Sequence, residues 1–161
     1  MKDKTTATSA MPWPSINPAG CNCLALRQAA RHVTQIYDQF LAPSGLRTTQ
    51  FSILAKLKRK GPQTINALAA DLVMDRTTLG RNILPLQRDG LIRIETSAAD
   101  RRAKQLALTK EGEQQLRAAA KLWYAAQARF DAVFGSQRAS DLRVLMATVV
   151  ASDFAAPVAA A

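Results

Sequence analysis

The chain is poor in the residue types on which several common functions depend. Its 161 residues include two cysteines, one histidine and 6% aromatic residues. Two cysteines do not build a disulfide framework, and two thiolates alone are too few for a closed zinc site. No apolar run approaches the roughly 18 residues of a membrane helix, and no secretory signal precedes Cys21. We therefore expect a cytoplasmic protein with reduced thiols that uses no metal, cofactor or membrane.

The same scarcity argues against an enzyme. The two cysteines are spaced C-x-C rather than C-x-x-C, and a single histidine is present. No phosphate-binding loop and no catalytic pair of carboxylates is apparent in the sequence. A thiol oxidoreductase is therefore only a remote alternative.

Positive charge is what the chain has in excess. The formal net charge is +10. Residues 47–110 carry 13 lysines and arginines against five acidic residues, a local net charge of +8. Because an ordinary solvated surface mixes the two signs more evenly, this concentration predicts a nucleic-acid-binding face. It is equally compatible with a nucleoid-type architectural protein that binds DNA with little sequence choice.

The spacing of apolar residues predicts a mostly helical protein with one small β-ribbon. Helices are expected at about 23–41, 48–60, 64–72, 75–89, 109–134 and 137–154, and strands at 91–96 and 104–108. Thr48 or Thr49, Asp75 and Thr109 are suited to cap the second, fourth and fifth helices. Outside these elements, the proline-containing residues 1–20 are expected to form a flexible arm, and residues 155–161 a disordered tail.

The fourth helix has a core face and an opposite face that suits DNA. Leu79, Ile83 and Leu86 are spaced to face the core. Residues near the start of such a helix reach base edges in a major groove, so Arg81 is expected to bind guanine and Asn82 adenine. The threonines of this face are expected to contact a phosphate or a thymine methyl group. The flanking arginines are expected to contact phosphates. The other candidate residues on this face are Arg76, Thr77, Thr78 and Arg88. The alternative is an ordinary exposed helix surface.

The loop between the two strands carries a second basic cluster, Asp100, Arg101, Arg102 and Lys104. An arginine at the tip of a ribbon is thin enough to enter a narrow A·T-rich minor groove, where the potential is most negative. Asp100 would be repelled by phosphate, so its expected role is to hold a neighbouring arginine. The alternative is a solvated turn.

Two segments, DRTTLGRNILPLQRDGLI and DRRAKQLALTKEG, closely resemble the MarR family of bacterial transcription regulators. The resemblance covers about residues 21–154. It implies a homodimer with a winged helix-turn-helix DNA-binding region over 47–108 and a helical dimerisation region built from 21–46 and 109–154. It further implies that Arg102 enters the minor groove with support from Asp100. The expected function is that of a repressor on a pseudo-palindromic operator in double-stranded DNA.

The resemblance also implies a trigger that releases DNA, and two candidates are open. Many family members bind phenolic or aromatic carboxylates between the first, second and fifth helices. A small aromatic acid would pair its carboxylate with basic side chains and lie against aromatic ones. The candidate residues are Arg27, His32, Tyr37, Arg47, Phe51 and Trp123. This is the trigger that we favour from the sequence.

The second candidate trigger is thiol oxidation. The segment from Cys23 through Tyr37 aligns with the organic-hydroperoxide-sensing branch of the family, in which the cysteine that matches Cys23 is oxidised. Cys21 would resolve a sulfenic acid on Cys23 under strain or bridge to the partner chain. Two tyrosines of that branch are replaced here by Arg27 and Thr48. Two ordinary cysteines at a helix start are an equal alternative.

Overall fold

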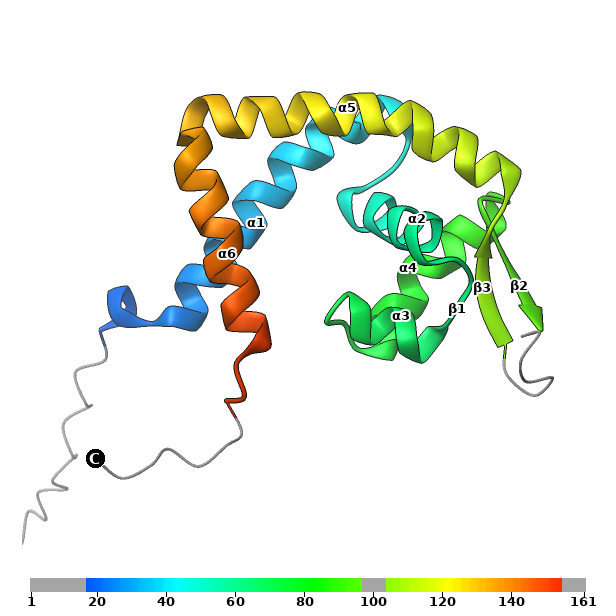
Figure 1. The fold of residues 1–161 in the computed structure, drawn as a ribbon, viewed down its shortest axis with the longest axis horizontal. Helices are drawn as coiled ribbons and strands as arrows, with labels where there is room; N and C mark the ends of the chain where they lie inside the picture. Colours follow the sequence, from blue (N-terminus) through cyan, green and yellow to red (C-terminus); the bar gives the residue numbers. More distant parts are fainter. Residues whose placement is uncertain (1–16, 97–103, 155–161) are drawn as a thin grey trace, which may run out of the picture. The chain divides into compact units, whose positions relative to one another are not determined.

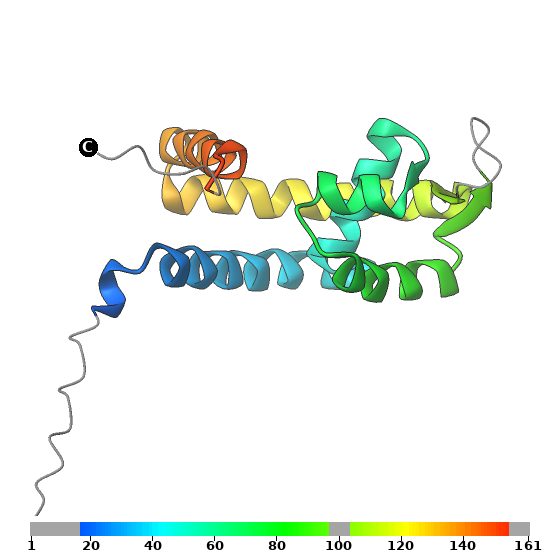
Figure 2. The same ribbon diagram turned by 90° about the horizontal axis from the view of Figure 1, so that it is seen from below.

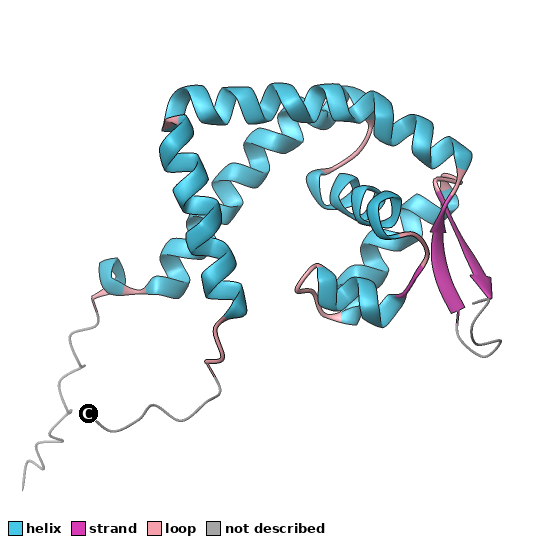
Figure 3. Ribbon diagram, in the orientation of Figure 1, coloured by secondary structure: helices cyan, strands magenta, loops and turns pink. Residues whose placement is uncertain are grey.

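A computed structural model describes residues 17–96 and 104–154 of the chain. The chain divides into two compact units, residues 1–33 and 34–161, and each is described by itself. The elements are α1 (Asn22–Leu41), α2 (Thr48–Lys60), β1 (Gln63–Thr64), α3 (Ile65–Asp71), α4 (Arg76–Arg88), β2 (Ile92–Thr96), β3 (Lys104–Leu108), α5 (Lys110–Phe134) and α6 (Ser136–Ala151), with two short 3-10 helices, η1 (Pro18–Gly20) and η2 (Ala42–Ser44). The expected fold class, mostly helical with a small β-ribbon, is confirmed (Figure 3).

The smaller unit contains η1 and the first part of α1. η1 lies in the segment expected to be a flexible arm, and the Asn17 side chain starts it by accepting a hydrogen bond from the Ala19 N–H at 3.1 Å. α1 begins at Asn22, one residue before the expected start. Residues 1–16 and 155–161, which hold the rest of the expected arm and the tail, lie outside the described residues.

The central lobe, defined as residues 46–108, has a leucine-rich core. The most deeply buried side chains of the lobe come from every one of its helices and from β2: Ile53, Leu54, Leu68, Leu79, Leu86 and Ile92. Leu41, the last residue of α1, joins the same cluster with 0% exposure. Each buried Leu or Ile side chain contributes roughly 1.5–3 kcal/mol of transfer free energy, so this cluster holds α4 firmly against the lobe.

The sheet has three antiparallel strands in the order β1-β3-β2. The β2–β3 pair is in the register Ile92↔Leu108 to Thr96↔Lys104. β1 adds a third strand, with Gln63 opposite Leu106. It was not expected from the sequence, because two residues are too few to show the alternation by which strands are recognised.

α5 begins immediately after the hairpin and is anchored to it. The Thr109 hydroxyl accepts a hydrogen bond from the Gly112 N–H at 2.9 Å and donates one to the Gly90 carbonyl at 2.7 Å. The expected cap at Thr109 is therefore confirmed. A side chain at Gly112 has no room, because a Cβ there would lie 2.0 Å from the carbonyl oxygen of Leu91. The first turn of α5 thus packs directly on the backbone that leads into β2.

α6 turns sharply away from the end of α5 (Figures 1 and 2). The turn is made at Gly135, whose φ of 95° is readily reached only by glycine. Ala139 is the one buried residue of α6, which ends at Ala151 rather than at the expected residue 154. Large apolar side chains are exposed along the end of α5, along α6 and just beyond it: Tyr124, Val133, Phe134, Val144, Leu145, Val149, Val150 and Phe154. This is an unusual amount of uncovered apolar surface for a chain that acts alone.

Candidate nucleic-acid interface

α4 is positioned by its buried face and by its first residue. Leu79, Ile83 and Leu86 are 0%, 4% and 1% exposed, as their spacing predicted. The Asp75 carboxylate caps the helix by accepting a hydrogen bond from the Thr78 N–H at 2.8 Å. Hydrogen bonds from Thr78 hold the pKa of Asp75 below its ordinary value. The start of α4 is therefore capped by a carboxylate that stays ionised at neutral pH.

The exposed start of α4 carries free cationic side chains. Arg76, Thr77, Thr78 and Arg81 are all exposed. Among the residues that the structure describes, neither Arg76 nor Arg81 has an ion-pair partner. A charged group without a partner on a rigid helix is ready to bind an anionic or base-edge ligand without first breaking another contact.

Two other candidates on α4 are already engaged. The Asn82 side-chain amide donates to the Thr78 carbonyl at 2.9 Å. The Arg88 guanidinium pairs with Asp89, with 2.9 Å between Nε and Oδ1, and this hydrogen bond raises the pKa of Arg88. Binding of a base by Asn82 or of a phosphate by Arg88 would have to compete with these contacts.

Pro85 lies inside α4 without ending it. The ring removes one backbone donor, so the carbonyl of Arg81 loses its usual partner four residues on. The helix nevertheless runs unbroken to Arg88, and the Pro85 carbonyl accepts from the Asp89 N–H at 2.9 Å. The proline therefore leaves the backbone hydrogen-bonded on its C-terminal side.

The hairpin places Lys104 at the first residue of β3, opposite Thr96 and exposed. On the neighbouring strand, Arg93 pairs with Glu95 at 2.8 Å and donates to the Leu108 carbonyl at 3.2 Å. The other three candidates of the loop, Asp100, Arg101 and Arg102, lie outside the described residues.

The aromatic effector candidates fall in two places of the larger unit. Phe51 of α2 stacks on Trp123 of α5, with 5.8 Å between ring centroids and 17° between planes. The Tyr37 hydroxyl donates instead to the Gln127 side chain. Burial raises the pKa of Tyr37, and the nearby negative charge of Asp131 raises it further.

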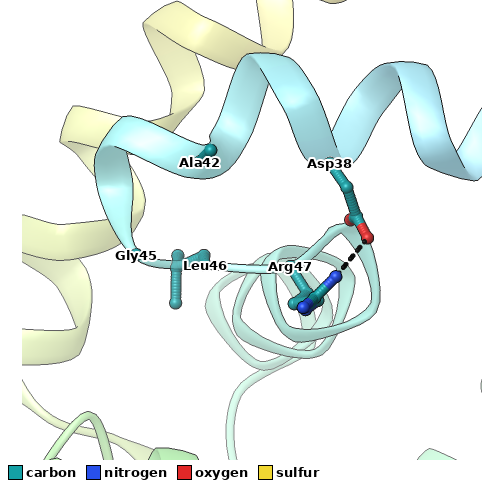
Figure 4. Close-up of a pocket in the computed structure, with 5 residues that line it drawn as sticks. All are labelled: Asp38, Ala42, Gly45, Leu46 and Arg47. Carbon is teal, nitrogen blue, oxygen red and sulfur yellow. Dashed lines mark hydrogen bonds and ion pairs between the residues drawn. The ribbon is translucent and has the colours of Figure 1, made fainter.

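Arg47 lies at a surface pocket of about 270 Å³ between the end of α1 and the start of α2 (Figure 4). Its guanidinium pairs with Asp38 at 3.3 Å. Ala42, Gly45 and Leu46 complete the lining. Asp38 was not predicted from the sequence, because its hydrogen-bond partners are known only once α2 is placed beside the end of α1.

The remaining effector and redox candidates belong to the smaller unit. Arg27 and His32 are exposed on α1. Cys21 and Cys23 are free and exposed, and the Cys21 sulfur accepts a hydrogen bond from the Leu24 N–H at 3.4 Å. Both thiols precede or occupy the first turn of α1, as the sequence predicted.

The described part of the chain shows neither a membrane-spanning helix nor a metal-binding cluster. No helix there combines the length and the apolar content needed to cross a membrane. No group of three or more histidine, cysteine or acidic side chains among residues 17–96 and 104–154 is arranged to hold a metal ion. The cationic face of α4 is therefore the site that the structure presents most clearly.

These features define the class of the protein. A capped helix with an exposed polar face, preceded by the short helix α3 and followed by a two-stranded hairpin, is a winged helix-turn-helix unit. A family model described as the MarR family matches residues 46–104, which is nearly the whole central lobe.

Two solved structures are similar over most of the chain. The transcriptional regulator MosR of M. tuberculosis in complex with DNA is 40% identical, with 81% of this chain and 97% of that chain covered and a TM-score of 0.69. The transcriptional repressor CouR, a Rhodococcus jostii RHA1 protein, bound to a 23-mer DNA duplex is 26% identical, with 81% and 93% covered and a TM-score of 0.73.

A curated relative gives the same assignment. The uncharacterised HTH-type transcriptional regulator YwoH of Bacillus subtilis is 32% identical over 88 residues, which are 55% of this chain and 64% of that protein. The match thus spans less than two thirds of that relative. The chain belongs to the MarR family of DNA-binding transcriptional regulators, and these relatives are regulators rather than enzymes.

Proposed function

We propose that the protein is a homodimeric, sequence-specific repressor that binds a pseudo-palindromic operator in the cytoplasm. The observation that carries this proposal is the pair of free arginines, Arg76 and Arg81, on the exposed start of a firmly packed helix. Each α4 would enter a major groove, and each hairpin would reach the adjacent minor groove through Arg102. Two half-sites would then lie about 10 bp apart, centre to centre. The structures of MosR in complex with DNA and of CouR bound to a DNA duplex support DNA as the ligand.

The exposed apolar side chains of α5 and α6 support the homodimer. Val144 and Val150 are both 64% exposed, and Leu145 is 59% exposed. A second copy would cover them by packing the same elements around a two-fold axis. Two-fold symmetry in the protein would then match two-fold symmetry in the operator.

The experiment that tests the proposal is a binding competition. A labelled fragment from the DNA upstream of the protein's own gene is titrated at constant salt against unlabelled random-sequence DNA of equal length. A specific repressor stays bound to the labelled fragment in a large excess of random-sequence DNA. Equal competition by random DNA would support the architectural protein instead, and loss of all binding would reject both.

For the trigger, we propose a small aromatic or phenolic acid that acts at the junction of α1 and α2. The pocket of about 270 Å³ there is bordered by Arg47, the one cationic effector candidate of the larger unit. An acid that pairs with Arg47 would compete with Asp38, which also holds the start of α2. Binding would thereby change how the central lobe is attached to α1.

This trigger is tested with salicylate and 4-hydroxybenzoate as probes. Each is added to the operator complex, and release is measured by fluorescence anisotropy for the wild type and for Arg47→Gln. We expect release from the wild type and a weaker response from the variant. Benzyl alcohol, which has the ring without the acid, is the control and should release nothing.

The exposure of the two cysteines supports thiol oxidation as the second candidate trigger. Cys21 and Cys23 are both free and both exposed, so peroxide has access to either sulfur. Oxidation would have to alter the start of α1, where the Cys21 sulfur now accepts from the Leu24 N–H.

The thiol candidate has a direct test. Operator binding is measured before and after treatment with cumene hydroperoxide, for the wild type and for Cys23→Ser. Release of the wild type alone would support the thiol trigger over the aromatic acid. If the wild-type protein stays bound to its operator after oxidation, the thiol trigger is ruled out.

A further inference from the structure

Leu84 is out of place on the polar face of α4. Thr77, Arg81, Leu84 and Arg88 follow one another at steps of four, three and four residues, so they share one face of the helix. Leu84 is 65% exposed, whereas the other apolar residues of α4 that form its opposite face are buried. A single exposed leucine is ordinary on a protein surface. An exposed leucine between two arginines, on the side proposed to face DNA, is expected to contact an apolar group of the DNA.

Gly80, one turn before Leu84, is also unexplained by the fold. Glycine inside a helix is destabilising relative to alanine, so a reason for it is expected. A Cβ at Gly80 would meet no atom within 4 Å, and the backbone there does not have the positive φ that favours glycine. At Gly112, in contrast, a glycine is required because a Cβ would clash with the Leu91 carbonyl oxygen. The missing side chain at Gly80 therefore leaves open space that none of the described residues fills.

The two features are adjacent on the helix surface. Long side chains on a helix lean toward its N-terminus and lie over the residues three and four positions earlier. The Leu84 side chain therefore leans toward Gly80 and Arg81. We call the open helix surface over the bare backbone of Gly80, on the side toward Leu84, the notch; no side chain of the described residues lies within 4 Å of where a Gly80 Cβ would stand.

The chemistry of the notch selects its partner. In the major groove, thymine presents a C5 methyl group, and apolar side chains read it by contact. A second copy of the chain is a poor alternative occupant, because Arg81 and Arg88 flank Leu84 and would repel the same residues of a symmetry mate. Contacts among the described residues explain neither the exposed Leu84 nor the open space at Gly80, and a thymine methyl group fits both.

We propose that Leu84, in the space left by Gly80, contacts the 5-methyl group of one thymine in each operator half-site and is a specificity-determining residue. The inference rests on the proposed function, because α4 must lie in the major groove. It adds a thymine preference to the guanine and adenine contacts expected from Arg81 and Asn82.

The test removes one methyl group at a time. Each thymine of the operator is replaced in both half-sites by deoxyuridine, which differs only in lacking the C5 methyl group. At one symmetric position we expect the wild type to bind about threefold to fivefold more weakly per half-site, the effect of exposing one methyl group. Leu84→Ala should bind the thymine and deoxyuridine operators equally at that position.

Two further variants complete the design. Gln87→Ala, which changes an exposed residue of α4 outside the shared face, is the matched control and should keep the wild-type preference for thymine. Gly80→Ala should raise the melting temperature of the free protein and yet weaken operator binding several-fold, because its methyl group fills the notch. Normal binding by Gly80→Ala would refute the role of Gly80.

The outcomes separate this inference from the proposed function. A wild type that binds its operator but is indifferent to every thymine-to-deoxyuridine change would overturn the inference alone. So would a Leu84→Ala variant that retains the wild-type discrimination. A wild type that fails to select its operator over random DNA would overturn the proposed function, and the inference with it.

Discussion

The Asp38 carboxylate accepts two hydrogen bonds from Thr48, one from the backbone N–H and one from the hydroxyl, each 2.7 Å long. The last turns of α1 thus cap the first turn of α2, across the loop that contains η2. From the sequence we expected Thr48 or Thr49 to cap this helix with its own side chain. Instead Arg47 is the N-cap position, and the capping oxygen belongs to Asp38, ten residues before Thr48.

Removing this cap should destabilise the protein. We expect Asp38→Ala to lower the free energy of unfolding at pH 7 by about 1–2 kcal/mol, because it removes a helix cap and leaves the Thr48 N–H without its partner. Urea denaturation followed by circular dichroism measures the change. The control is Asp141→Ala, an exposed residue of α6, which should shift stability by no more than about 0.5 kcal/mol.

The same carboxylate predicts a dependence on acid. Burial raises the pKa of Asp38, but the hydrogen bonds from Thr48 and Arg47 more than offset it, so its pKa lies below the ordinary value. Its stabilising effect is therefore complete above the unfolded pKa of about 3.9 and is lost as the pH falls through the folded pKa. The difference in unfolding free energy between wild type and Asp38→Ala should be constant above about pH 5 and shrink below about pH 4. A difference that persists at lower pH would contradict this account.

Gly112 of α5 and Gly80 of α4 should respond oppositely to substitution by alanine. Gly112→Ala places a Cβ 2.0 Å from the Leu91 carbonyl oxygen and 2.8 Å from Leu108, so we expect a loss of at least about 2 kcal/mol in unfolding free energy. Gly80→Ala has open space and should gain about 0.5–1 kcal/mol. Thermal melts of both variants test the pair. If both substitutions changed the stability equally, the close approach of Gly112 to Leu91 would be contradicted.

Arg81→Ala should cost about 1–3 kcal/mol of operator binding and relax the preference for one base. Arg88→Ala and Arg102→Ala should weaken binding with less change in preference, because phosphate and minor-groove contacts are less selective. Anisotropy titrations against operators with single base changes separate the two behaviours. Wild-type affinity in both Arg81→Ala and Arg102→Ala would refute the contact assignment.

A charge on the exposed face of α6 should separate the two copies of the proposed homodimer. Leu145 is 59% exposed, and we expect Leu145→Asp to shift the protein toward monomer, because a carboxylate would be buried between two copies. Sedimentation velocity at micromolar concentration measures this. Lys121→Asp, on an exposed part of α5, is the control and should leave the proportion of dimer unchanged.

Much of the fold was predictable because its signals are local. The face formed by Leu79, Ile83 and Leu86 and the caps at Asp75 and Thr109 could be recognised from spacing alone, and each is confirmed. The expected bounds of β3, Lys104–Leu108, match the structure, because the Thr109 cap marks where the strand must end.

What could not be predicted depends on contacts between distant residues. The Asp38 cap on α2, the third strand β1 and the close approach of Gly112 to Leu91 arise only once separate segments meet. The candidate site shows the same limit. Spacing placed Asn82 on the polar face, but its hydrogen bond to the Thr78 carbonyl appears only in three dimensions.

α5 runs for 25 residues without a glycine or proline after its first turn, which makes it a stiff rod of about 37 Å. One end rests on the backbone of Leu91 beside the hairpin, and the other carries Asp131 within 4.0 Å of Arg143 on α6. Such a rod has no joint at which strain can dissipate. A tilt of about 5° at the α6 end would displace the hairpin end by roughly 3 Å. That is comparable to the rise of one base pair, so in the proposed complex a small shift at α6 would be large enough to misalign the hairpin with DNA.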